Sequence, residues 1–108
     1  MSFLLTKDKI KEIYTGVGNR GCLVSNQILC EGRCVGYMYR EKPDSTFPDS
    51  GWRFFSGTED DEYVNDPQNI SLVDLNTVCN YDASVLPYLE LPFYVALVRR
   101  NGRFVIED

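Results

Sequence analysis

The segment 49–63 constrains the fold of this chain most, because it joins the only tryptophan to the densest run of negative charge. The aromatic run that starts at Trp52 is bounded by Gly51 and Gly57, a pattern typical of a strand that crosses a sheet. Four consecutive carboxylates follow at Glu59–Glu62, and such groups need water or a cationic partner. The segment therefore predicts a buried strand that leads to an acidic surface.

Alternation along this strand divides its side chains between two faces. Trp52 and Phe54 share one face, which we predict to be packed in the core. Arg53 projects from the opposite face, where it either pairs with an acid of the 59–62 run or stays free for recognition. We assign a structural role to the motif formed by Gly51, Trp52, Phe54 and Gly57.

The acidic run has two interpretations. With Thr58 as the N-cap, its first acids would lie in the first turn of a helix, where carboxylates complement the helix dipole. Alternatively, the run is part of an acidic surface that attracts a basic partner. Residues 41–66 contain eight acids and two bases, and the whole chain has a net charge of -5. This balance argues against nucleic acid as the partner, because phosphate binding needs clustered lysine and arginine.

Residue types needed for most catalytic and metal chemistry are missing or badly spaced. The sequence contains no histidine, which removes the commonest general base and the Ser-His and Cys-His nucleophile pairs. The cysteines match no zinc-knuckle spacing, so we expect buried, inert thiols, with a redox pair of Cys30 and Cys34 as the alternative. The cysteines are Cys22, Cys30, Cys34 and Cys79. We therefore predict a protein that is not an enzyme and has no catalytic residues, cofactor or metal.

The apolar run near the start is too short for a targeting or membrane-spanning segment. Phe3-Leu4-Leu5 precedes Lys7 and falls far below the length of a secretory h-region or a span. We therefore expect a cytoplasmic protein with reduced thiols and no membrane partner.

Apolar periodicity and turn residues predict a single small α+β domain over residues 1–108. Helical segments are expected over Ser2–Tyr14, after Thr58, at the end of 70–79 and over 82–89. Strands are expected over 22–25, 34–41, 52–56, the start of 70–79, 93–99 and 103–106, with a loop over 42–50 and a hairpin turn at Arg100-Asn101-Gly102. Because short turns join most neighbouring strands, we predict a mostly antiparallel sheet with short helices packed on one face.

At these residues the chain resembles a bacterial family that was first catalogued as a domain of unknown function. It was later placed among the immunity proteins of polymorphic toxin systems, as the thirty-third numbered immunity family. The resemblance covers about residues 22–92 and is most specific at Ser50-Gly51-Trp52-Arg53-Phe54. Other matching segments are 24–26, 28–29, 35–41, 59–63, 65–66, 69–70, 74–77 and 86–89. The chain departs from the family at Phe93–Ile106, an apolar hairpin where relatives tend to end in a polar segment.

The resemblance implies a non-enzymatic protein that binds a cognate toxin and blocks it. If the toxin is basic, such as a nuclease, carboxylates would take the place of substrate phosphates, and attraction between charges would speed the encounter. We predict contacts through the acidic surface and through Tyr and Arg side chains, which are enriched at interface centres. The predicted partner-binding residues are Tyr39, Arg40, Arg53, Glu59, Asp60, Asp61 and Glu62.

A second functional class is a small regulatory or ligand-binding module that uses an aromatic sheet face as a pocket. Its rings would be Tyr37, Tyr39, Trp52 and Phe54. A deep cavity lined by these rings would favour the module, whereas a filled core with an acidic surface would favour toxin binding. The oligomeric state is left open, since the C-terminal hairpin has a strand edge through which a dimer would form.

Overall fold

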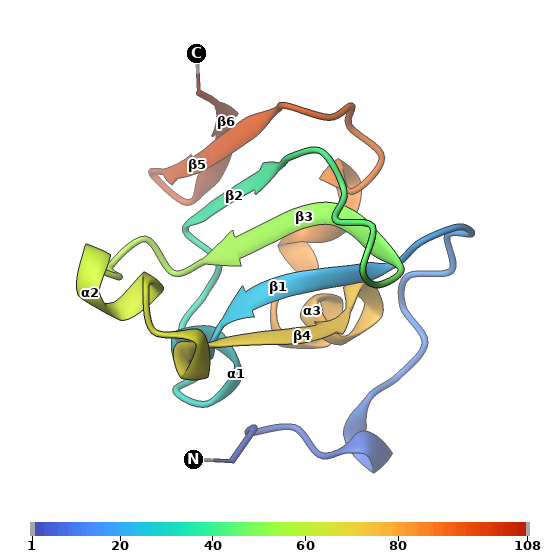
Figure 1. Ribbon diagram of the computed structural model, residues 1–108, viewed down its shortest axis with the longest axis horizontal. Coiled ribbons are helices and arrows are strands. Elements are labelled where there is room, and N and C mark those ends of the chain that lie inside the picture. The colour runs from blue at the N-terminus through green and yellow to red at the C-terminus, as the bar shows by residue number, and fades with distance from the viewer. Residues whose placement is uncertain (1, 108) are drawn as a thin grey trace.

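A six-stranded sheet runs through the molecule in the order β4-β1-β3-β2-β5-β6 (Figure 1). The computed structural model describes residues 2–107. The strands are β1 (Gly21–Ser25), β2 (Tyr37–Arg40), β3 (Asp49–Phe55), β4 (Ile70–Asp74), β5 (Ala96–Arg100) and β6 (Arg103–Ile106). β1 and β3 run parallel, and the other four neighbouring pairs are antiparallel. The predicted α+β fold with a mostly antiparallel sheet is confirmed.

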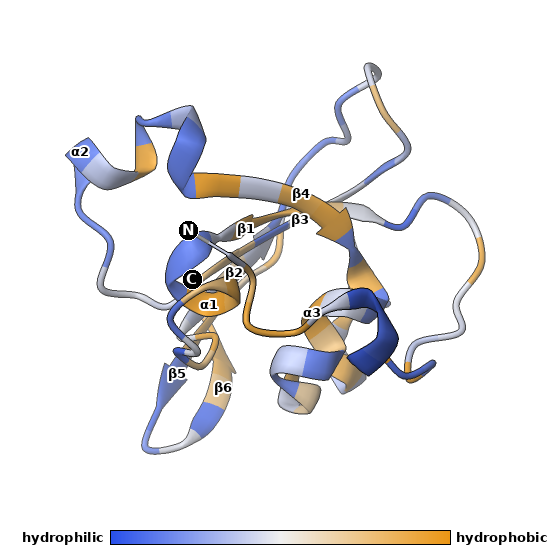
Figure 2. Ribbon diagram, turned by 90° about the horizontal axis from the view of Figure 1, so that it is seen from below, coloured by the Kyte–Doolittle hydropathy of each residue, from blue (hydrophilic) through white to orange (hydrophobic). Residues whose placement is uncertain are grey.

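Short helices cover one face of this sheet (Figure 2). They are α1 (Asn26–Leu29), α3 (Leu75–Tyr81) and the 3-10 helix η3 (Ala83–Tyr88). The other short helices are η1 (Lys7–Lys9), α2 (Asp61–Val64) and η2 (Pro67–Asn69). α2 stands beyond the end of β3, beside the sheet rather than over its core face (Figure 1).

The core lies between the sheet and α1, α3 and η3. Its largest fully buried side chains are Trp52, Phe54, Ile28, Leu29, Met38, Leu75, Leu89, Leu97, Val24, Val35, Val78 and Val85. The indole Nε1 of Trp52 donates a hydrogen bond to the carbonyl oxygen of Leu89 (3.0 Å), so the polar edge of this ring is satisfied inside the core. Trp52 and Phe54 lie on the core face of β3, as predicted.

The helix predicted over Ser2–Tyr14 is wrong, because the described part of this segment contains only the single turn η1. The segment passes alongside α3, where the side chain of Asn76 accepts hydrogen bonds from the backbone of the segment. Asn76 Oδ1 accepts hydrogen bonds from the NH groups of Ile13 (2.7 Å) and Tyr14 (2.8 Å). A distant side chain thus satisfies backbone donors that a local helix would otherwise have satisfied.

Two further contacts hold the same segment. Asn80 Oδ1 accepts a hydrogen bond from the NH of Lys11 (2.8 Å). Tyr14 is 8% exposed and packs in the core, while its hydroxyl donates to Glu90 Oε1 (3.0 Å). The N-terminal segment is therefore attached to the domain by both polar and apolar contacts.

The C-terminal half agrees with the predicted elements, except that the strand expected from Phe93 begins at Ala96. Segment 70–79 is β4 followed by α3, and segment 82–89 contains η3. The predicted hairpin is β5 and β6, joined by Asn101 and Gly102 with φ angles of 52° and 78°. These positive angles are those of a two-residue turn that matches the twist of the strands.

β3 is longer than predicted. It begins at Asp49, so the last two residues of the expected 42–50 loop belong to the strand. Gly51 makes this possible: its φ is 91°, and an added Cβ would lie 2.3 Å from the carbonyl oxygen of Glu41. Glu41 NH in turn donates to Gly51 O (2.9 Å). β2 is shorter than the expected 34–41 strand and covers Tyr37–Arg40.

Gly51→Ala is expected to lower the free energy of unfolding by about 3 kcal/mol, because a backbone clash adds to the cost of a positive φ. Gly18→Ala is the matched control. Gly18 has a φ of 93° with nothing within 4 Å of an added Cβ, so we expect a loss of about 1 kcal/mol. Urea denaturation followed by circular dichroism measures both losses. Equal losses would contradict the importance of the close approach to Glu41.

Candidate functional site

The sheet face opposite the core carries an apolar surface that we call the open face. The strand registers place one apolar side chain from every strand on it: Leu72, Leu23, Phe55, Tyr37, Val98 and Val105. All six are half-buried or exposed, and Leu72 (54%) and Val105 (41%) are the most exposed. Contiguous apolar surface is uncommon on soluble monomers and marks interaction sites.

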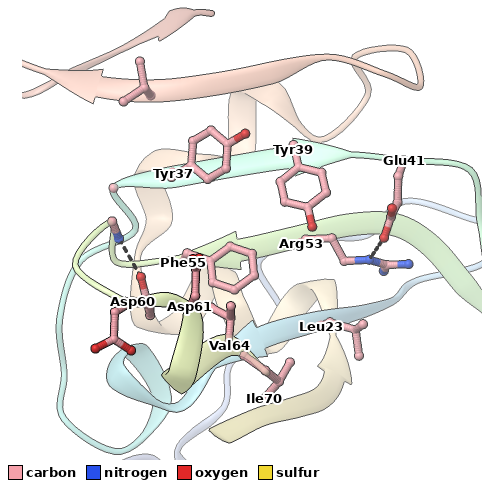
Figure 3. A pocket seen from close by; sticks show the side chains of 14 residues that line it. Leu23, Tyr37, Tyr39, Glu41, Arg53, Phe55, Asp60, Asp61, Val64 and Ile70 are labelled. Carbon is pink, nitrogen blue, oxygen red and sulfur yellow. Dashed lines mark hydrogen bonds and ion pairs between the residues drawn. The ribbon is translucent and has the colours of Figure 1, made fainter. Parts of the chain in front are cut away.

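A groove of about 620 Å³ lies on the open face, beside α2 (Figure 3). The rings of Tyr37, Tyr39 and Phe55 form its floor. Tyr39 and Phe55 are stacked with their centroids 6.1 Å apart and their planes 8° apart, and Tyr37 is tilted by 41° against Tyr39. Charged side chains also line the groove: Glu41, Arg53, Glu59, Asp60 and Asp61.

The rings that would form the pocket of a ligand-binding module are divided between the two faces of the sheet. Tyr37 and Tyr39 line the groove, whereas Trp52 and Phe54 are fully buried in the core. The expected pocket of four rings is therefore wrong. The arrangement is that of a filled core beneath an open face with acidic side chains.

Arg53 belongs to the open face but is only 4% exposed. Its Nη1 and Nη2 donate to the two carboxylate oxygens of Asp49 (2.9 and 2.8 Å), and its Nε donates to Glu41 Oε2 (2.6 Å). Burial acts to lower the pKa of Arg53, but its bonds to these two carboxylates outweigh burial and raise the pKa above its ordinary value. Neither alternative predicted for Arg53 holds, because its partners lie outside the 59–62 run and its guanidinium is not free.

Asp49 is the centre of this charged cluster and is 1% exposed. Besides Arg53, the NH groups of Asp44 (2.7 Å) and Gly51 (2.9 Å) donate to its carboxylate. Burial acts to raise the pKa of Asp49, but these hydrogen bonds and the Arg53 charge outweigh burial and lower the pKa. The ionised carboxylate therefore ties the loop before β3 to the strand itself.

Glu59 closes the turn that follows β3. Its two carboxylate oxygens accept hydrogen bonds from the NH groups of Ser56 (2.8 Å) and Gly57 (2.9 Å). Burial acts to raise the pKa of Glu59, but hydrogen bonding to the Ser25 side chain and to backbone NH groups lowers the pKa overall. Gly57 has a φ of 96°, which explains the glycine at this position of the motif.

The rest of the acidic run begins α2. Asp60, rather than the predicted Thr58, is the N-cap, and its Oδ1 accepts a hydrogen bond from the NH of Tyr63 (2.8 Å). Asp61 and Glu62 are exposed in the first turn. The salt bridges found among residues 2–107 involve none of the acids from 59 to 62. The run therefore starts a helix, as the first interpretation predicted, and attraction of a basic partner stays a prediction.

Tyr39 and Arg40 lie on opposite faces of β2. Tyr39 is part of the groove floor, whereas Arg40 points to the core side. The Arg40 Cζ lies 4.5 Å from the ring centroid of Phe93 and 5.9 Å from that of Trp52. Arg40 Nη1 also donates to the carbonyl oxygen of Leu91 (2.6 Å). Arg40 thus links Leu91 and Phe93, in the segment before β5, to Ser50 and Trp52 of β3.

Sequence reasoning missed the apolar part of the groove. The sequence did contain a signal for Phe55. Side chains alternate along a strand, so Phe55 is predicted to share the face of Arg53, opposite to Trp52. No comparable signal existed for Leu23 and Val98. These residues join the groove only through strand order and register, which are set by long-range pairing.

The four cysteines are free thiols in two environments. Burial raises the pKa of Cys22 well above its ordinary value and that of Cys79 to about 11. Cys30 is half-buried and Cys34 is exposed, so the expectation of buried thiols is wrong for these two. In the part of the chain that the structure describes, no group of three or more His, Cys, Asp and Glu side chains could hold a metal ion. Over the same residues, no helix has the length and apolar character of a membrane span.

Residues 22–106 match the family model described as the Immunity protein Imm33 domain. The match extends past residue 92 and includes β5 and β6. No curated protein and no solved structure matches the chain.

Acid is expected to destabilise the protein through Asp49. A carboxyl group whose pKa is lowered by folding contributes stability above its unfolded pKa, which is about 3.9 for aspartate. That contribution is lost as the pH falls through the still lower folded pKa, so the free energy of unfolding should decrease below about pH 4.

Asp49→Asn should therefore be less stable than the parent at neutral pH and show a shallower decrease in acid. Glu62→Gln, at an exposed side chain, is the control and should follow the parent protein. Urea denaturation over a series of pH values measures both variants. An Asp49→Asn protein with the parental pH dependence would contradict this role of Asp49.

Proposed function

Because the chain belongs to the Imm33 immunity protein family, we propose that it neutralises a cognate bacterial toxin by binding the toxin protein directly. Proteins of an immunity family generally act by binding and without turnover. The observation that carries the proposal is the open face, where all six strands contribute an apolar side chain. A sheet that is covered by helices on one face only leaves the other face available to a partner.

The charge beside the groove supports a basic toxin domain, for example a nuclease. Asp60, Asp61 and Glu62 stand together on α2 without a salt bridge to any residue in the 2–107 range. Carboxylates so placed attract a cationic surface over about a Debye length, roughly 8 Å at physiological ionic strength. We therefore propose that the acidic run steers the toxin and that the apolar open face forms the centre of the contact.

The residues predicted to bind the partner divide into two roles in this proposal. Tyr39, Glu59 and the acids of α2 border the groove or stand beside it, and they contact the toxin. Arg40 and Arg53 have their guanidinium groups bonded within the domain, so they hold the surface in shape. Neutralisation takes place in the bacterial cytoplasm, before the toxin reaches its substrate.

Co-expression tests the proposed function directly. The protein serves as bait in a lysate of its source organism, and each captured protein is then expressed alone and together with the bait. We expect one captured protein that stops growth when expressed alone and is harmless with the bait. Growth arrest by every captured toxin despite co-expression would contradict the proposal.

Charge reversal tests the role of the acidic run. Asp61→Lys with Glu62→Lys should slow association with the captured toxin by about tenfold at low salt, because electrostatic steering is lost, and should change dissociation little. Asp8→Lys with Glu12→Lys makes the same change of net charge at exposed sites in the N-terminal segment and is the control. Surface plasmon resonance at two salt concentrations measures the rates. Equal effects of the two double variants would contradict steering by α2.

A further inference from the structure

We infer that the groove on the open face receives an arginine side chain of the protein partner. The guanidinium would stack on the floor made by Tyr39 and Phe55 and face Asp61, with Asp60 next to it at the start of α2 (Figure 3). This inference rests on the proposed function, because it names the partner group that the same surface takes.

The floor suits a flat cation. The ring planes of Tyr39 and Phe55 are nearly parallel, with 8° between them, and both residues are half-buried, so the rings are held in place and still accessible. A planar guanidinium stacks on aromatic faces and gains from the negative charge of the ring face. A lysine ammonium is a compact, strongly hydrated point charge without a plane to match the rings. The floor therefore favours arginine.

The charges that line the groove also suit a cation. Four carboxylates and one guanidinium line it. That guanidinium belongs to Arg53, which bonds to the carboxylates of Asp49 and Glu41. These two negative charges outweigh the single positive charge of Arg53. Asp60 and Asp61 stand on the α2 side of the groove (Figure 3). An entering guanidinium would meet net negative charge despite the presence of Arg53.

Apolar side chains supply a place for the stem of the arginine. Leu23 and Ile70 lie along one side of the groove, as does Val64 of α2 (Figure 3). Val98 is the register partner of Tyr37 on β5. Long cationic side chains bury their methylene groups on apolar surface while the charged head keeps polar contacts. The groove offers both surfaces within one space of about 620 Å³.

Two short peptides test the inference without the toxin. N-acetyl-Leu-Arg-Leu-amide carries the guanidinium, and N-acetyl-Leu-citrulline-Leu-amide replaces it by a neutral group of nearly the same shape. Titration of the isotope-labelled protein at millimolar peptide is followed by NMR. We expect shifts of the Tyr37, Tyr39 and Phe55 ring signals and of the Val64 and Val98 methyl signals. The arginine peptide should bind about fivefold more tightly than the citrulline peptide.

Variants in which carboxylates are neutralised show which negative charges contribute to binding of the arginine peptide. Asp60→Asn with Asp61→Asn removes two groove carboxylates, and asparagine at position 60 remains a good N-cap. Asp8→Asn with Glu12→Gln removes two exposed carboxylates of the N-terminal segment that do not line the groove. We expect the first variant to weaken binding of the arginine peptide by about threefold and the second to leave it unchanged.

The inference is overturned by equal binding of the two peptides, by no binding of either, by shifts confined to other surfaces, or by equal effects of the two double variants. The peptide titrations and the co-expression experiment can fail independently of each other. Neutralisation of a toxin without arginine binding would remove only the inference. Arginine binding without a neutralised toxin would remove only the proposed function.

Discussion

The ion cluster of the buried Arg53 and Asp49 with the more exposed Glu41 is the interaction on which the arrangement of the open face depends. Asp49 and Arg53 belong to β3, and Glu41 follows β2, so the cluster fixes the end of one strand against the other. Asp44 NH also donates to Asp49, which brings the preceding loop into the same cluster. Removing Arg53 would leave the Asp49 carboxylate without a counter-charge at a position that is 1% exposed, a change that costs about 3–5 kcal/mol in buried ion pairs.

β3 connects this cluster to the core. Its even-numbered side chains, Trp52 and Phe54, are fully buried, while Arg53 and Phe55 belong to the groove on the other face. Gly51 allows the strand to approach the chain at Glu41. One short segment therefore both completes the core and shapes the surface that we assign to the partner. The sequence motif around the only tryptophan can be explained in this way without a catalytic role.

Local patterns predicted the parts of the fold that depend on local interactions. Alternation placed Trp52 in the core, and Asn101-Gly102 placed the last hairpin, because both signals act over a few residues. The partner of Arg53 and the N-cap of α2 at Asp60 were missed, since equally good local alternatives existed. The groove could not be predicted, because strand order brings its side chains together.

Asn76 and Asn80 determine how far the N-terminus of this protein can be shortened. The family match begins at residue 22, but these two asparagines bond to the backbone of residues 11–14, and the ring of Tyr14 fills part of the core. A fragment trimmed to the matched residues would lose these bonds and open a void beside α3. Shortened versions for crystallisation or for display on phage should therefore start well before the matched region.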